Sequence, residues 1–304
     1  MISLSSGSTG FRRLLPALLA GALTITTSWA APVAASTAVQ AAAAATVAAT
    51  PPVDGRVLPA DMARIKARGE LVVAVPNFDS PPFFYGQGKD LTGIDINLAE
   101  GIAQELGVKL RFNRDAKSFN GVVDRVANGE ADLAICKLSR TLERAQAIRY
   151  SEPYLKLRHA LALNRIAFAR LAHGQELPDV IRHFNGTLAV IAKSSFADFA
   201  KRNFPLATIK EYPTWDAAVA AVKTGEVVAT YRDEFEIKRL LKEDNQASLT
   251  LRTVTLDDLT DTIGIATNAS DPQLLSFVNL YLSQRQERLD VGKVLQALAA
   301  IHHP

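Results

Sequence analysis

The chain has 304 residues, which is too long for one ordinary domain and suits a leader segment followed by two domains. Arg12 and Arg13 are the only charged residues among the first 53, so the other 251 residues carry 32 basic and 31 acidic side chains. A body this close to neutral lacks the basic surface of a nucleic-acid-binding protein. The single cysteine, Cys136, excludes an internal disulfide framework and a zinc site built from several cysteines.

The first 30 residues are typical of an export signal. Arg12 and Arg13 precede the apolar run LLPALLAGALTIT, and the triplet SWA that follows predicts cleavage after Ala30. A retained membrane anchor is the alternative, but the run contains Pro16 and is shorter than the ~20 apolar residues of a spanning helix. Because no cysteine lies near the run, we expect no lipid anchor. The mature chain is therefore expected outside the cytoplasm.

Residues 31–55 are predicted to be a spacer. The part from 31 to 50 contains 11 alanines and is followed by two prolines. Alanine favours a helix, but the segment has no amphipathic pattern and hence no apolar face to bury. We expect it to be disordered or weakly helical.

The rest of the chain predicts strands that alternate with helices. The predicted strands span 71–75, 109–112, 131–135, 160–164, 187–191, 208–212, 227–232, 249–252 and 262–267. The predicted helices span 60–68, 94–106, 119–127, 141–147, 175–183, 196–203, 215–223, 234–243, 271–286 and 289–300. Apolar runs such as LVVAV indicate buried strands, and the alternation favours an α/β fold with mainly parallel sheets. So many units favour two lobes over one sheet.

Several motifs of catalysis and nucleotide binding are absent from the sequence. No G-x-G-x-x-G follows the first strand, and neither a P-loop nor a G-x-S-x-G motif occurs. The five histidines contain no H-E-x-x-H or H-x-x-x-H pair. We therefore expect neither a cofactor nor a metal ion.

Two long segments carry a more specific signal than their periodicity. The first is GELVVAVPNFDSPPFFYGQGKDLTGIDINLAEGIAQELGVKLRF, and the second, SFNGVVDRVANGEADLAICKLSRTLERAQAIRYSEPYL, contains T-x-E-R and Y-S-E-P-Y. In order and spacing they resemble the family-3 extracellular solute-binding proteins, the polar amino-acid receptors of bacterial ABC importers. Weaker similarity continues through GTLAVIAKSSF and KTGEVVATYRDEFEIKRLLKED. The resemblance covers about residues 56–300.

This resemblance implies the two-lobed periplasmic-binding-protein fold of type II. Two α/β lobes would be joined by two crossover strands, with lobe 1 formed by 56–157 and 254–304 and lobe 2 by 158–253. The lobes of such proteins close on a ligand by hinge motion. The implied function is a monomeric periplasmic receptor that binds a polar amino acid and delivers it to the membrane permease of an ABC importer.

The resemblance also implies where the two ends of an amino acid bind. Arg144 stands where the arginine of the T-x-E-R motif binds the α-carboxylate, and a guanidinium offers two parallel donors to that group. Ser139 matches a loop hydroxyl beside the ligand. Asp233 matches the aspartate that pairs with the α-ammonium, although Asp also suits the N-cap of the helix that follows.

Ser194 and Ser195 occupy a further binding loop of the family, in which Lys193 replaces a glycine. A helix N-terminus at this point would still present N–H groups to an anion. The substitution puts the local backbone of the loop in doubt.

Other residues would set the specificity. Phe119 corresponds to the aromatic residue that stacks on the ligand side chain, and Asn77 and Asp79 would face the cleft. Asn77 stands where binders of basic amino acids carry an aspartate, which disfavours lysine or arginine as ligand. If Lys137 and Arg140 contact the ligand, they favour an acidic amino acid, whereas as solvated surface charges they carry no such information.

Two alternatives share the same scaffold. One is an enzyme that resembles the periplasmic cyclohexadienyl dehydratases, which would need a general acid in the cleft. Its candidate acids are Glu211, Asp216, Glu234 and Glu236. The other alternative is a sensory module whose closed state is read by a partner protein.

Overall fold

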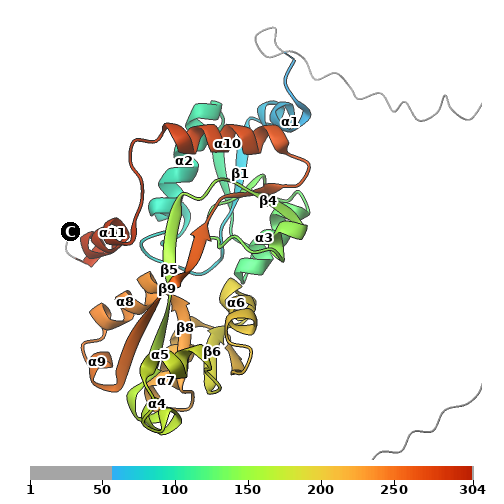
Figure 1. Cartoon of the computed structure of the whole chain (residues 1–304). Helices are drawn as coiled ribbons and strands as arrows, with labels where there is room; N and C mark the ends of the chain where they lie inside the picture. Colours follow the sequence, from blue (N-terminus) through green and yellow to red (C-terminus); the bar gives the residue numbers. More distant parts are fainter. Residues whose placement is uncertain (1–56, 303–304) are drawn as a thin grey trace, which may run out of the picture. The chain divides into compact units, whose positions relative to one another are not determined.

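The computed structural model describes residues 57–302, which belong to one compact unit that begins at Thr50. These residues form two five-stranded sheets with helices packed around each (Figure 1). The predicted export signal and the predicted spacer both lie outside the described residues. Within 57–302, no helix has the length and apolar character needed to cross a membrane.

The first sheet has the strand order β2-β1-β3-β10-β4. Its strands are β1 (Glu70–Ala74), β2 (Lys109–Asn113), β3 (Leu133–Ala134), β4 (Ile148–Tyr150) and β10 (Ala266–Asn268). The helices adjacent in sequence are α1 (Ala60–Arg68), α2 (Ile94–Leu106), α3 (Phe119–Ala127), α10 (Pro272–Gln284) and α11 (Val291–His302), with short 3-10 turns η1 (Gly88–Asp90) and η2 (Arg144–Gln146). Strand β1 is parallel to β2 and β3, whereas β10 is antiparallel to β3 and β4.

The second sheet has the strand order β7-β6-β8-β5-β9. Its strands are β5 (Leu155–Asn164), β6 (Thr187–Ile191), β7 (Thr208–Tyr212), β8 (Ala229–Asp233) and β9 (Leu251–Ile263). Its helices are α4 (Arg165–Ala172), α5 (Leu177–Arg182), α6 (Ser195–Asn203), α7 (Trp215–Thr224), α8 (Glu234–Glu243) and α9 (Ala247–Thr250). Strand β6 is parallel to β7 and β8, and β5 is antiparallel to β8 and β9.

The α/β architecture was predicted, but the prediction of mainly parallel sheets is wrong. Each sheet contains as many antiparallel as parallel pairings, because the segments that cross between the sheets enter them in the opposite direction. Strand β4 and helix α4 were not predicted. The predicted strand 249–252 meets only the start of β9, which runs over Leu251–Ile263. The predicted strand 262–267 covers the last two residues of β9 and the first two of β10.

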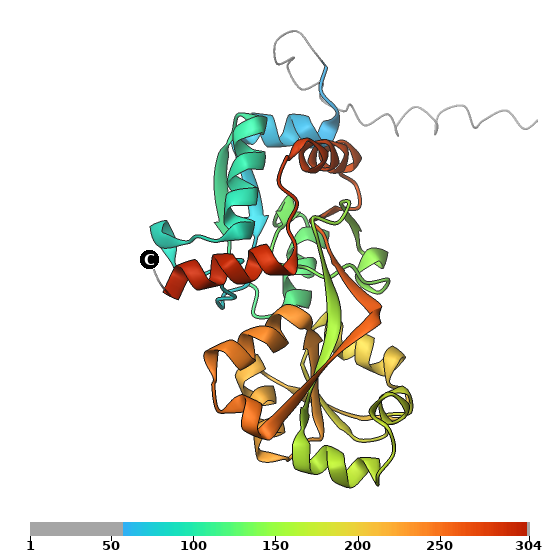
Figure 2. The ribbon, with the colours of Figure 1, turned by 60° about the vertical axis from the view of Figure 1, so that its left-hand side comes forward.

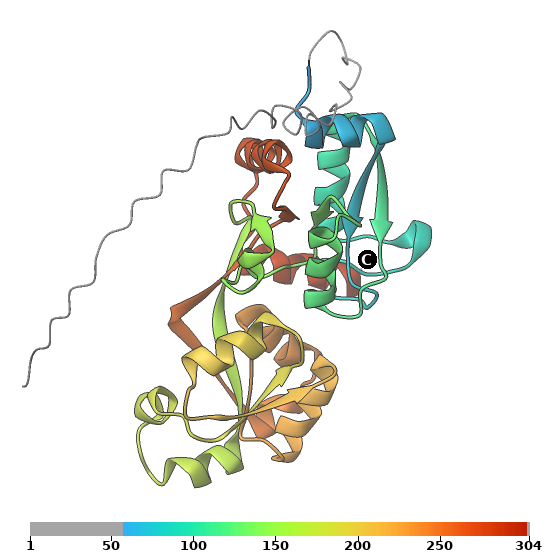
Figure 3. The same cartoon turned by 90° about the vertical axis from the view of Figure 1, so that its right-hand side faces the viewer.

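Strands β5 and β9 connect the two sheets. They pair along their length, from Leu155 opposite Ile263 to Asn164 opposite Leu251, with a bulge after Arg158. Figure 3 shows the two strands running together from the region of the first sheet into the second. The predicted lobe boundaries, 157/158 and 253/254, fall inside these strands.

Helix α11 links the elements around the first sheet to α8 of the second. It packs beside α8 (Figure 2). Phe235 of α8 belongs to the same apolar cluster as Val294 and Leu298 of α11. The ring of Phe235 also meets Phe83, edge to face, at 5.5 Å between centroids. Burial of these side chains stabilises the approach of the two sheets, since removing apolar area from water is favourable.

The backbone at Gly93 fixes the loop that carries Phe83. Gly93 has φ +130°, and a Cβ at this position would lie 2.3 Å from the carbonyl oxygen of Phe83. Only glycine fits this approach. Helix α2 begins at the next residue, so this contact sets the Phe83 loop against the start of the helix.

Candidate functional site

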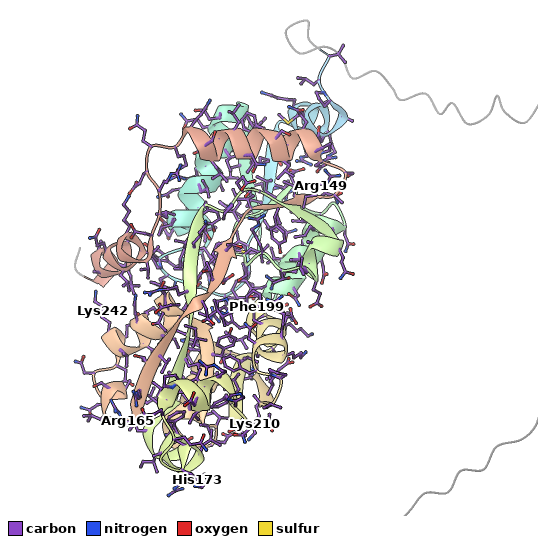
Figure 4. All side chains as sticks on the ribbon, in the orientation of Figure 1. Arg149, Arg165, His173, Phe199, Lys210 and Lys242 are labelled. Atoms are coloured by element: carbon purple, nitrogen blue, oxygen red, sulfur yellow. The ribbon has the colours of Figure 1, made fainter. Side chains whose placement is uncertain are left out.

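A small cavity lies where loops of the first sheet meet the second sheet. Its volume is about 20 Å³, which is room for about one water molecule. Its lining consists of Phe119, Lys137, Ser139, Arg144, Ser194, Ser195, Phe196, Arg232, Asp233 and Asp261. Seven of these ten are residues that the sequence predicted for the ligand site. Figure 4 labels Phe199 on α6 near the level at which the two sheets approach each other, and shows Arg165, His173 and Lys210 far from it.

Arg144 is buried beside this cavity, and hydrogen bonds to two residues hold its guanidinium group. Its Nε and Nη2 donate to Oδ1 of Asn120 at 2.9 and 2.8 Å, and Nη1 donates to the carbonyl of Ser139 at 3.0 Å. Thr141 orders the turn by accepting from the backbone N–H of Arg144 at 3.2 Å. These bonds use three of the five guanidinium N–H groups, so donors remain on both terminal nitrogens for a carboxylate.

A chain of hydrogen bonds at the cavity links α6, through a loop of the first lobe, to strand β9. The hydroxyl of Ser195, at the start of α6, donates to that of Ser139 at 2.8 Å. Ser139 in turn donates to Oδ2 of Asp261 at 2.8 Å. Asp261 is 1% exposed, and among the described residues its other oxygen, Oδ1, has no hydrogen-bond partner. A buried oxygen without a partner is costly, which marks Oδ1 as a position for a solute group.

Burial and, to a smaller extent, the neighbouring charge of Asp233 raise the pKa of Asp261, which reaches about 7. The bond from Ser139 and the charges of Lys137 and Arg144 act in the opposite direction. Near neutral pH this carboxyl therefore exists in both protonation states. In its protonated state it donates a hydrogen bond, and in its ionised state it accepts only.

Asp233 makes contacts that leave little room for a ligand ammonium. Its Oδ1 accepts from the backbone N–H of Glu236 at 3.2 Å and so caps α8, as its residue type suggested. Its Oδ2 accepts from Nζ of Lys137 at 2.8 Å. The ion pair thus occupies the carboxylate that the sequence assigned to a ligand ammonium.

The ion pair belongs to a buried cluster of charges. Lys137 Nζ also donates to Oε1 of Glu236 at 2.8 Å, and all three side chains are at most 3% exposed. Arg232 and Arg239 lie within 3.6 Å of Glu236. Burial alone would raise the pKa of Glu236, but the charges of Lys137, Arg232 and Arg239 lower it to about 2. The glutamate is therefore ionised throughout the neutral range.

Two of the loops that line the cavity, those of Lys137 and Lys193, each contain a lysine in the left-handed backbone conformation. Lys137 has φ +51° and Lys193 has φ +54°. Positive φ is uncommon for residues other than glycine. Lys193 therefore adopts the backbone that a glycine would supply, and the loop still places Ser194 and Ser195 in the cavity lining.

The structure places two predicted site residues away from this lining. Asn77 is exposed, and its backbone N–H donates to the carbonyl of Ala116. Arg140 packs beside Gly264, and its N–H donates to the carbonyl of Thr262. Asp79, also expected to face the cleft, forms an ion pair with Arg114 at 3.2 Å.

A larger cavity of about 330 Å³ adjoins the small one and shares Phe119 and Arg232 with it. Phe78 and Ser118 line it from the first sheet's side, and Trp215 lines it from the second. The guanidinium of Arg232 lies over the Trp215 ring, 5.5 Å from its centroid. Ligand pockets of proteins typically have volumes of about 300–1,000 Å³, so this cavity has the size for a small solute.

Several residues of the site carry no local signal in the sequence and were not predicted. Asp261 and Arg232 lie within strands, and Asn120 acts by orienting Arg144. Their proximity to the cavity arises from strand pairing, which no local motif shows. Among residues 57–302, no group of three or more His, Cys, Asp or Glu side chains could hold a metal ion.

The acids considered for catalysis lie in different surroundings. Glu211 and Asp216 are exposed. Glu234 is buried and paired with Arg158 and Lys238 at 3.0 and 2.7 Å. Glu236 belongs to the cluster around Lys137. The carboxyl best placed at the small cavity is therefore Asp261.

The family model for "Bacterial extracellular solute-binding proteins, family 3" matches residues 71–294. The chain belongs to this family. The fold confirms the two-lobed, type II architecture expected for it, in which the two sheets form the cores of the two lobes.

Two solved structures illustrate the likeness. The amino acid ABC transporter substrate-binding protein AbpA from Streptococcus pneumoniae, bound to L-arginine, is 27% identical, with a TM-score of 0.60 over 78% of this chain and 96% of that one. An ancestral amino acid-binding protein, described as a precursor of cyclohexadienyl dehydratase, is 24% identical, with a TM-score of 0.61 over 78% of this chain and 98% of that one. The second likeness shows the fold alone.

Enzymes also occur among the relatives. The membrane-bound lytic murein transglycosylase F of Alcanivorax borkumensis is 28% identical over 200 residues, which are 64% of this chain and 41% of that protein. The transglycosylase F 1 of Alkalilimnicola ehrlichii is 33% identical over 45% of this chain and 26% of its own length. The chain thus spans less than half of these relatives.

Proposed function

We propose that the chain is a solute receptor that binds a small polar carboxylate, an amino acid or a related acid, between its two lobes. The buried Arg144 is the observation that carries this proposal. Asn120 and the Ser139 carbonyl hold its guanidinium in place, and donors remain on both terminal nitrogens. A guanidinium held in this way suits bidentate binding of a carboxylate.

Residues from both lobes line the site, which supports binding by closure. Arg144 and Ser139 come from the first lobe, and Ser195 and Arg232 come from the second. A solute that touches both sets has more contacts in the closed state, so it shifts the population toward that state. The hydrogen-bond chain from Ser195 through Ser139 to Asp261 supports such a closed arrangement.

We further propose that this receptor works in the periplasm as a monomer and delivers its solute to an ABC permease. Membership of the extracellular solute-binding family supports this location. The export signal expected in residues 1–30 is consistent with it. The similarity to AbpA, a substrate-binding protein of an amino acid ABC transporter, supports a permease as the partner.

A thermal-shift screen of the purified chain tests the proposed function. The panel contains the common amino acids, dicarboxylates and simple monocarboxylates, each at millimolar concentration. A solute at 100 times its dissociation constant stabilises the folded state by about 2.7 kcal/mol, which raises the melting temperature by several degrees. If no member of the panel raises it, the assignment as a receptor for small carboxylates is contradicted.

An enzyme on the same scaffold is a second candidate, and Asp261 is the observation that favours it. Its carboxyl lines the cavity, and burial raises its pKa to about 7, which suits a general acid at neutral pH. Incubation with arogenate or prephenate, followed by the absorbance of the aromatic product, tests this candidate. Product formed by the wild type and not by Asp261→Asn would support it, and no product with the wild type would reject it for these substrates.

A further inference from the structure

The ammonium group of Lys137 stands where a solute ammonium would meet Asp233. Its Nζ donates to Asp233 and to Glu236, at 2.8 Å in each case. The rings of Phe83 and Phe235 lie 5.2 and 5.1 Å from the same nitrogen. Two carboxylates and two aromatic rings are the surroundings that proteins offer to a bound cation. In this chain they surround a cation of its own.

A second ammonium would find cations as neighbours. Arg232 Nε lies 3.6 Å from Oδ2 of Asp233, and its Nη2 lies 3.6 Å from Oε1 of Glu236. The two carboxylates are therefore shared between Lys137 and Arg232. An added ammonium would be repelled by both, and repulsion between like charges is strong where water is excluded.

The groups that remain open suit an anion. Arg144 keeps donors on both terminal nitrogens. Nε of Arg232 is buried and has no hydrogen-bond partner among the described residues. Asp261 lines the same cavity, and its Oδ1 has no hydrogen-bond partner among the described residues. When protonated, this carboxyl donates a hydrogen bond. The same oxygen could instead accept a hydrogen bond from a solute ammonium, so the test must separate these two roles.

The larger cavity offers room for the rest of the solute. The small cavity, at about 20 Å³, holds no more than a water molecule or a single group of the solute. Phe119 and Arg232 border both cavities, and the larger one measures about 330 Å³. A carboxylate near Arg144 can therefore belong to a solute whose body extends past Phe119 toward Trp215.

We propose that Lys137 replaces the ammonium group of the solute, so that this chain binds small carboxylates without an α-ammonium group in preference to amino acids. The proposal rests on the proposed function, since it assumes that a carboxylate binds at Arg144. It makes Lys137 the residue that determines specificity between the two classes.

Matched pairs of solutes test the proposal on the unmodified chain by isothermal titration calorimetry. Glutarate with glutamate, propanoate with alanine, and 3-phenylpropanoate with phenylalanine each differ by the ammonium group alone. We expect the member without the ammonium to bind at least tenfold tighter in the pair that fits the cavity. An amino acid that binds as tightly as its partner overturns the inference and leaves the proposed function standing.

The variant Lys137→Gly extends the test. Glycine adopts φ +51° without strain, and the substitution exposes Asp233 and Glu236 to an incoming ammonium. In the pair that fits the cavity, the order of affinity should then reverse. The amino acid should bind this variant at least tenfold tighter than it binds wild type. His173→Gly is the matched control, because His173 has φ +47° and lies far from the cavity (Figure 4). It should bind as wild type does.

The outcomes separate the two proposals. If Lys137→Gly binds the amino acids no better than wild type, Lys137 does not hold the place of the ammonium and the inference is overturned. If an amino acid binds wild type and loses its affinity in Asp261→Asn, the ammonium binds at Asp261 and the inference is again overturned. If no member of any pair binds either wild type or Lys137→Gly, the proposed function itself is contradicted.

Discussion

The Nζ atom of Lys137 lies 2.8 Å from Oδ2 of Asp233, although 96 positions separate the two residues in the chain. Lys137 follows the first-lobe strand β3, and Asp233 ends β8 and caps α8 of the second lobe. The side chains of both residues are buried. A charged contact between the lobes is thus part of the protein's own structure.

Removing the charge of Lys137 should destabilise the fold. In Lys137→Met the length of the side chain is kept, but Asp233 and Glu236 lose the ammonium that both accept from. Loss of one partner from a buried ion pair typically costs about 3–5 kcal/mol, because an uncompensated charge stays buried. Urea unfolding should show this as a lower midpoint at an unchanged slope.

Lys223→Ala is the control for this loss. Lys223 pairs with Asp244 at 2.5 Å, but both side chains are partly exposed. Exposed pairs contribute little to stability because water and salt screen them. Equal midpoints for Lys137→Met and Lys223→Ala would show that the buried pair does not stabilise the closed lobes.

Stability should depend on pH through Asp261. Burial raises its pKa from 3.8 to about 7 in the folded chain. Between about pH 4 and pH 7 the unfolded state loses this proton while the folded state retains it, so the free energy of unfolding falls as the pH rises. Asp261→Asn should flatten this slope in urea unfolding measured from pH 4 to pH 8.

Asp95 contributes to the same window, because burial raises its pKa to about 7 as well. The slope should therefore decrease without vanishing in Asp261→Asn. Asp90→Asn, a substitution at an exposed aspartate, should leave the slope as in wild type. A slope that is identical in wild type and Asp261→Asn would contradict the raised pKa.

Ser195 should contribute to solute affinity through the closed state. Its hydroxyl donates to Ser139 across the cavity, and this bond joins the lobes at the site. A net hydrogen bond contributes about 1 kcal/mol, so Ser195→Ala should weaken solute binding roughly fivefold in calorimetry. Ser248→Ala removes an exposed serine hydroxyl and should bind as wild type does. Equal affinities for both variants would exclude this role of Ser195.

Much of the site could be predicted because it follows motifs that are local in the sequence. Arg144 and Ser139 lie five positions apart in one loop, so a single match places both. The N-cap role of Asp233 was also readable, since aspartate before an amphipathic helix is a common start signal.

The interactions of Lys137 could not be predicted in this way. Its partners, Asp233 and Glu236, lie 96 and 99 positions away, and only the approach of the two lobes brings them together. The sequence therefore left open whether Lys137 contacts a ligand or water. The structure shows it bound to carboxylates of the other lobe.

Asp261 was missed because β9 has no apolar run. The segment LRTVTLDDLTDTI is largely partly buried or exposed, so its pattern indicates a strand only at its ends. The prediction placed a strand boundary at 262, one residue beyond Asp261. Long crossover strands such as this one gain their stability from pairing, here with β5, which the periodicity of one segment does not reveal.

The most direct test of the account is calorimetric titration of Arg144→Ala with the solute that the screen identifies. Arg149→Ala is the matched control, because Arg149 is an exposed arginine on β4 and lies away from the cavity (Figure 4). The account predicts that Arg144→Ala remains folded and loses at least 100-fold in affinity, which corresponds to about 2.7 kcal/mol, while Arg149→Ala binds as wild type does. Unchanged affinity in Arg144→Ala would contradict the central claim that this arginine holds the solute between the lobes.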